Sequence, residues 1–75
     1  MDKPKDLEEL ETYIGKLFKL PGQDDKTKWS VFVSIEKYNH DFNEVTVTYL
    51  SPTGEVRITP AILSGFLKIM KESNQ

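Results

Sequence analysis

The residues of this sequence that could do chemistry are few and scattered. The single histidine, His40, is followed directly by Asp41 in a segment rich in turn-forming residues. A catalytic triad needs a nucleophile, a base and a carboxylate that meet in space, and two neighbours in a turn do not supply that arrangement. The sequence therefore gives no support for catalysis at His40.

The acidic and glycine residues do not form a catalytic pattern either. Glu8, Glu9 and Glu11 fall on the polar side of a predicted helix, where solvated charge is the simplest interpretation. A phosphate-binding loop needs clustered glycines, and those of this chain are widely separated. They are Gly15, Gly22, Gly54 and Gly65. We expect a protein that is not an enzyme and that uses no cofactor.

Length and charge narrow the class of protein. The chain has 75 residues, which is enough for one domain spanning residues 1–75, and its formal charge of −2 creates no strong attraction for nucleic acid. It has no cysteine, so we expect no disulfide, no metal site and a cytoplasmic location. No apolar run reaches the roughly 20 residues that cross a bilayer, so we expect no membrane association.

The first element that could position functional residues is a helix, predicted over about residues 6–20. Its apolar side chains fall on one arc at 100° per residue. Asp6 suits the N-terminal cap and Pro21-Gly22 ends the run. The apolar arc consists of Leu7, Leu10, Tyr13, Ile14, Leu17, Phe18 and Leu20.

Three strands are predicted next, at about residues 28–38, 44–50 and 55–59, because polar and apolar residues alternate there. Short turn-rich segments join them, which indicates an antiparallel meander. The alternation predicts one buried face, formed by Trp29, Val31, Val33, Val45, Val47, Tyr49, Val56 and Ile58.

A second amphipathic helix is predicted over about residues 60–72, with Thr59 as its cap and Pro60 in its first turn. The chain is thus predicted to be an α+β protein with two layers in the order α-β-β-β-α, both helices covering one face of the sheet. The alternative is an SH3-like barrel in which Ile14 to Leu20 and Phe66 to Met70 form strands.

The open face of the predicted sheet is the candidate binding surface. An exposed aromatic ringed by hydroxyl side chains and an arginine could anchor a protein partner or a stacked base. The candidate residues are Phe32, Ser34, Tyr38, Thr46, Thr48 and Arg57. The alternative is that a bulge turns Phe32 inward. The first strand is also a predicted sheet edge, through which two copies could pair as a homodimer.

Part of this pattern resembles the methyl-CpG-binding domain family. The similarity covers about residues 29–70 and rests on Trp29 in the first strand, the Tyr-Leu-Ser-Pro-Thr-Gly run at 49–54, and Thr59 opening the last helix. The resemblance implies a similar scaffold of sheet and helix. A looser likeness to double-stranded RNA-binding domains concerns only the order of elements.

The residues with which the methyl-CpG family reads DNA differ here. Glu55 stands where the family has a lysine after the turn glycine, and Ile58 stands where it has an arginine. Thr46 and Thr48 stand at its acidic and tyrosine positions. The resemblance therefore does not imply methyl-DNA reading. We expect a protein-interaction or regulatory module that uses the open sheet face or the edge strand, and the alternative is a nucleic-acid-binding domain that uses the same face.

Overall fold

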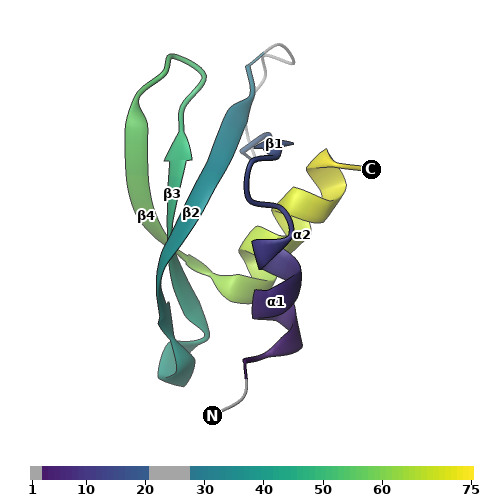
Figure 1. Ribbon diagram of the computed structural model, residues 1–75, viewed down its shortest axis with the longest axis vertical. Coiled ribbons are helices and arrows are strands. Elements are labelled where there is room, and N and C mark those ends of the chain that lie inside the picture. Colours follow the sequence, from purple (N-terminus) through teal and green to yellow (C-terminus); the bar gives the residue numbers. More distant parts are fainter. Residues whose placement is uncertain (1–2, 21–27) are drawn as a thin grey trace.

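The computed structural model describes residues 3–20 and 28–75, which form an α+β protein (Figure 1). The strands of this part of the chain make one antiparallel sheet in the order β1-β2-β3-β4. Both helices lie on the same side of the sheet, as predicted (Figure 1). The elements are α1 (Lys5–Glu11), β1 (Leu17–Phe18), β2 (Ser30–Asn39), the 3-10 helix η1 (His40–Phe42), β3 (Glu44–Leu50), β4 (Val56–Ile62) and α2 (Leu63–Ser73).

The first helix is shorter than predicted, because α1 ends at Glu11 and not near residue 20. Thr12 begins a turn in which its hydroxyl donates to the Glu9 carbonyl (2.6 Å), a side-chain bond that competes with helix continuation. Gly15 completes the turn with φ +90°, a conformation that other residues adopt only with strain. The prediction of a helix over 6–20 was therefore wrong beyond its second turn.

Residues Leu17–Phe18 form a fourth strand, β1, that the sequence pattern did not predict as its first choice. The Gly15 N–H donates to the Phe32 carbonyl (2.7 Å), and the Phe32 N–H donates to the Lys16 carbonyl (3.0 Å). The end of α2 also binds β1, since the Asn74 side-chain amide donates to the Leu17 carbonyl (3.0 Å). The SH3-like alternative was right about a strand in this segment, whereas its proposed strand at Phe66 to Met70 lies within α2.

The last strand is longer than predicted. β4 pairs with β3 as far as Ile62 opposite Glu44, so Thr59 and Pro60 are strand residues and not the start of a helix. α2 begins at Leu63 and buries residues with the i, i+3, i+4, i+7 spacing of an amphipathic helix. Those residues are Leu63, Phe66, Leu67 and Met70.

The core fills the space between the helices and one face of the sheet. Phe66 of α2 makes edge-to-face contacts with Phe18 (ring centroids 5.4 Å apart) and with Phe32 (5.2 Å). Aromatic pairs in this arrangement contribute beyond the area that they bury. The remaining buried apolar residues are Leu7, Leu10, Val45, Val47, Leu63, Leu67 and Met70. We call the covered side of the sheet the helix-side face and the other side the outer face.

Candidate functional site

The structure divides the predicted binding residues between the two faces of the sheet. Phe32 is 0% exposed and belongs to the core, so its prediction as an exposed anchor was wrong. Tyr38 lies opposite the buried Val45, and Arg57 lies opposite Tyr49, so both belong to the helix-side face. The other three candidates lie on the outer face: Ser34, Thr46 and Thr48. They do not form one surface.

Two bulges in β2 explain the misplacement of Phe32. The register with β3 slips between Phe32 and Ser34, and again between Ile35 and Lys37. Each bulge inserts one residue, which changes the spacing of residues on one face from two to three. The residues of β2 that face the helices are therefore Phe32, Ile35 and Tyr38. The alternative that a bulge turns Phe32 inward is confirmed.

The outer face carries apolar residues that were predicted to be buried. Val56 is 66% exposed and Ile58 is 65% exposed, although the alternation predicted both in the core. Trp29 and Val33 were predicted in the core as well, and both are exposed. Antiparallel register places Val56 beside Leu50, and Leu50 beside Val31. We call the resulting line across all four strands the apolar row: Leu17, Val31, Leu50 and Val56.

Polar residues occupy the middle of the outer face. The Glu36 carboxylate accepts hydrogen bonds from the Ser34 hydroxyl and from the Thr48 hydroxyl (2.8 Å). These two hydrogen bonds, that of Ser34 first, hold the pKa of Glu36 below its usual value of 4.5. A carboxylate that is stabilised in its charged form resists transfer into an apolar interface. The centre of the outer face is therefore suited to solvent, and its apolar residues lie to the β4 side and in the apolar row.

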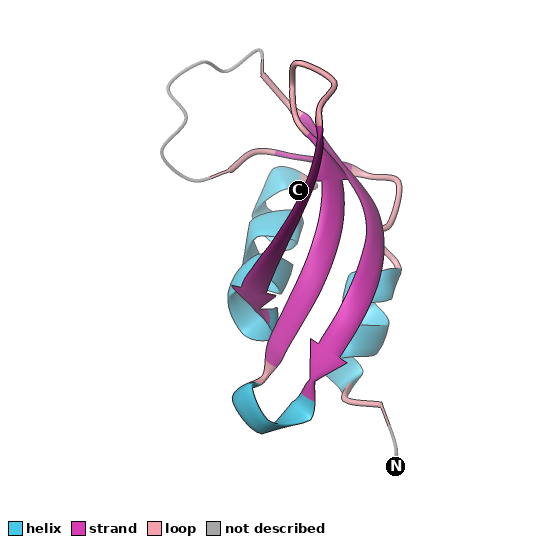
Figure 2. Cartoon of the chain, turned by 90° about the vertical axis from the view of Figure 1, so that its left-hand side faces the viewer, coloured by secondary structure: helices cyan, strands magenta, loops and turns pink. Residues whose placement is uncertain are grey.

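The free side of β4 is the most regular edge of the sheet. Every residue from Val56 to Ile62 pairs with β3 without a register shift, and the described residues place no strand beyond it (Figure 2). Four of the residues of β4 are exposed and apolar on the outer face: Val56, Ile58, Pro60 and Ile62. The charged residue of β4, Arg57, lies on the helix-side face, where it forms an ion pair with Glu55 (2.9 Å).

Backbone hydrogen bonds show which groups of β4 are unpaired. The Ser51 N–H donates to the Glu55 carbonyl and the Leu63 N–H donates to the Asn43 carbonyl, both at 2.8 Å. Hydrogen-bonded positions alternate along an antiparallel strand, so the odd-numbered residues of β4 direct their backbone N–H and C=O groups toward β3. The even-numbered residues direct their polar groups to the free edge. Pro60 is one of them, and its missing N–H therefore costs no bond to β3.

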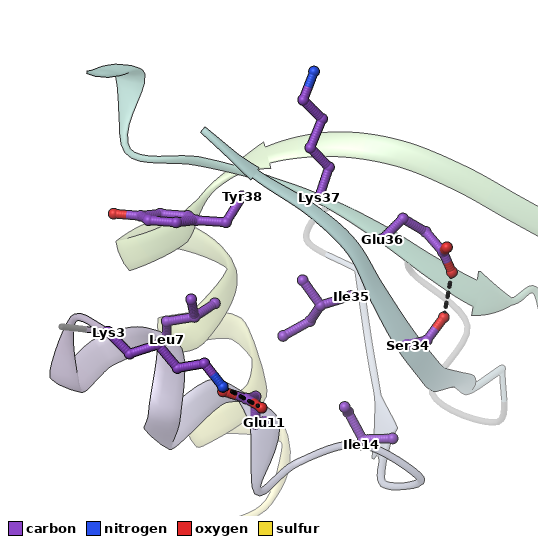
Figure 3. A pocket seen from close by; sticks show the side chains of 9 residues that line it. All are labelled: Lys3, Leu7, Glu11, Ile14, Ser34, Ile35, Glu36, Lys37 and Tyr38. Carbon is purple, nitrogen blue, oxygen red and sulfur yellow. Dashed lines mark hydrogen bonds and ion pairs between the residues drawn. The ribbon is translucent and has the colours of Figure 1, made fainter. Parts of the chain in front are cut away.

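The opposite edge of the sheet is less suited to pairing. β1 covers the start of β2, and the two bulges interrupt the remainder, which is a common way to protect an edge. A groove of about 340 Å³ lies between this part of β2 and α1 (Figure 3). Leu7, Ile35 and Tyr38 give it an apolar wall, and the Lys3–Glu11 ion pair (2.8 Å) lies on its α1 side. The first strand predicted as a free edge is thus partly covered.

Within residues 3–20 and 28–75, no group of three or more histidine, aspartate or glutamate side chains could hold a metal ion. The His40 Nδ1 lies 3.7 Å from the Asp41 Oδ1, and both side chains are strongly exposed in η1. No helix in this part of the chain is long and apolar enough to cross a membrane. The polar composition of residues 23–27 predicts a connecting loop, and this segment lies outside the described residues.

Comparison with protein-family models, with curated proteins and with solved structures found no match for this chain. The resemblance to the methyl-CpG-binding domain family stays a prediction. One of its features differs in the structure, because Thr59 lies in β4 and does not open the helix. The β4 edge itself was missed by the sequence analysis, although the unbroken apolar spacing of Val56, Ile58, Pro60 and Ile62 is a signal that could have indicated it.

Proposed function

We propose that this protein is an interaction module that binds a protein partner through the β4 edge and the adjoining part of the outer face. The observation that carries the proposal is the coincidence of unpaired backbone groups and exposed apolar side chains in one regular strand. Added strands bind through main-chain hydrogen bonds, and alternate side chains provide specificity. Val56, Ile58 and Ile62 would supply those side chains.

The charge distribution supports a protein partner over nucleic acid. A nucleic-acid surface needs cations that can reach several phosphates together. Arg57 is ion-paired with Glu55 and lies on the helix-side face, and Lys37 shares the outer face with Glu36 and Glu44. The cationic and hydroxyl residues that the nucleic-acid alternative needs on one surface are divided between two.

Affinity capture from the source cell tests this proposal. Immobilised wild-type protein should retain a partner that an Ile58→Lys variant loses, because a lysine on an edge strand opposes strand addition. Thr53→Lys, in the exposed turn before β4, is the matched control and should retain the partner. Circular dichroism checks that both variants are folded. Equal capture by wild type and Ile58→Lys would contradict the proposed surface, and a partner released steeply by salt would favour the nucleic-acid alternative.

A further inference from the structure

The β4 strand is complementary to itself. When two antiparallel copies of β4 are related by a two-fold axis at Thr59, Val56 of one copy lies opposite Ile62 of the other, and Ile58 lies opposite Pro60. All of these are edge-facing positions with apolar side chains on the outer face. Backbone groups at these positions can therefore exchange hydrogen bonds, except where Pro60 lacks its N–H.

Charge disfavours one shifted register of this pairing. Arg57 would lie opposite Ala61 of the other copy, on the helix-side face. Shifting the axis from Thr59 to Arg57 would place two arginines directly opposite each other, and like charges in that position are destabilising. Between Val56 and Ile62, β4 has no other charged residue, so the remaining feature of the strand that opposes pairing is the missing N–H of Pro60.

The outer face favours edge pairing over packing of two sheets face to face. Face-to-face packing would bury the Glu36 carboxylate with its Ser34 and Thr48 partners, and burial of an ionised carboxylate without a counter-charge is unfavourable. Edge pairing leaves Glu36 in solvent. It also brings the exposed apolar side chains of the two β4 strands together as cross-strand neighbours, a contact that stabilises sheets.

We infer that the occupant of the β4 edge is a second copy of this chain, forming a symmetric dimer with one continuous sheet. This inference rests on the proposed function of the β4 edge as a binding surface and names its partner. The outer faces of both copies lie on one side of the joined sheet. The apolar row of each copy then continues from Val56 onto Ile62 of the other.

Sedimentation equilibrium of the full chain tests the dimer, at concentrations from about 10 µM to about 1 mM. The expected mass rises from 8.7 kDa toward twice that value. Ile58→Lys should raise the dimer dissociation constant at least about tenfold, because the symmetric interface contains the change twice. Val56→Lys is a second variant with the same expectation, in case the first does not fold.

Leu17→Lys is the matched control, because Leu17 is 50% exposed on the outer face but lies in β1, at the other side of the sheet. It should leave dimerisation unchanged, whereas face-to-face packing would be weakened by it. Amide hydrogen exchange adds a positional readout. The Val56, Ile58 and Ile62 amides should be protected at high concentration and exchange faster on dilution, since they face the edge.

A monomer at every concentration would overturn the inference, as would a dimer whose edge amides stay unprotected or that Leu17→Lys dissociates. The outcome is separable from that of the proposed function. A monomeric protein that still loses a captured partner on Ile58→Lys substitution would support the surface and contradict only its occupant. If the chain dimerises but Ile58→Lys leaves partner capture unchanged, the result would contradict capture of another protein through β4 and support a second copy as the occupant of this edge.

Discussion

Replacing Phe32 by alanine tests the placement of β2 directly. Phe32 is fully buried and lies 5.2 Å from Phe66, ring centroid to ring centroid, in an edge-to-face contact. Truncating a buried phenylalanine to alanine typically lowers the free energy of unfolding by about 3–5 kcal/mol, because transfer energy is lost and a cavity is left. The aromatic pair with Phe66 is worth about 0.5–1.5 kcal/mol, which places the expected loss in the upper part of that range.

That loss is large for a chain of this size. Domains are stable by about 0.05–0.15 kcal/mol per residue, so 75 residues correspond to roughly 4–11 kcal/mol. Phe32→Ala should therefore unfold at much lower urea concentration, or be unfolded without urea. Phe32→Leu keeps an apolar side chain and should lose about 1–2 kcal/mol, which keeps the transition measurable.

Urea unfolding followed by circular dichroism gives the comparison, with Phe42→Ala as the matched control. Phe42 is 71% exposed in η1, so its truncation should change the free energy of unfolding by less than about 0.5 kcal/mol. If Phe32→Ala were as mild as Phe42→Ala, Phe32 could not be in the core. The bulged register of β2, and with it the assignment of residues to the two faces, would then be refuted.

Three further predictions concern local features of the fold. Gly15→Ala should lower the free energy of unfolding by about 1–2 kcal/mol, because Gly15 has φ +90°. Gly65→Ala, at an exposed position within α2, should raise the free energy of unfolding by about 0.5–1 kcal/mol. Thermal unfolding should therefore show midpoint shifts of opposite sign, and shifts of equal sign would contradict the turn at Gly15. The pKa of Glu36 is lowered in the folded state, so its stabilising effect is present above pH 4.5 and is lost as pH falls through the lower folded value. Unfolding midpoints of wild type and Glu36→Gln should therefore differ at neutral pH and converge in acid, and a difference independent of pH would count against the hydrogen bonds of Glu36. Ser30 is buried and its hydroxyl makes no hydrogen bond among the described residues, so Ser30→Ala should leave the free energy of unfolding unchanged or raise it by up to about 1 kcal/mol; a clear loss in chemical denaturation would show that the hydroxyl is bonded.

The elements that were predicted correctly are those whose pattern is regular over several turns or pairs. Val45, Val47 and Tyr49 alternate without interruption in β3, and all three contact the core. The stripe of α2 from Leu63 to Met70 has the same clarity. In both cases local pattern and tertiary burial agree, so the sequence was sufficient to predict the α+β class and the covered face of the central strand.

The first helix was predicted to be too long, because its helical-wheel pattern is compatible with two different structures. Leu7 and Leu10 are buried by α1, whereas Phe18 is buried by β1 and Leu17 on the outer face is half exposed. A continuous apolar arc arises from either arrangement over so short a segment. Gly15 was the available signal, since a glycine that is unfavourable within a helix is favourable at a turn with positive φ.

The two faces of β4 were predicted the wrong way round, because the geometry of the preceding turn sets the register of the strand. The Ser51 N–H bonds to the Glu55 carbonyl, and Gly54 adopts φ +88° within this turn. This closure places Leu50 opposite Val56, so the apolar positions of β4 follow Leu50 to the outer face. A register change of one residue reverses both faces of a strand, and the length of the turn alone does not reveal it.

The two edges of the sheet differ in a way that bears on how far association could proceed. An exposed regular edge on each side would let copies add without limit, which leads to fibres. Here bulges and β1 obstruct the β2 edge, while β4 keeps a regular ladder interrupted only at the Pro60 nitrogen. Symmetric pairing through β4 would use the regular β4 edge of each copy and leave the obstructed β2 edges outward. The same asymmetry that supports the proposed binding surface at β4 would therefore end assembly at the dimer.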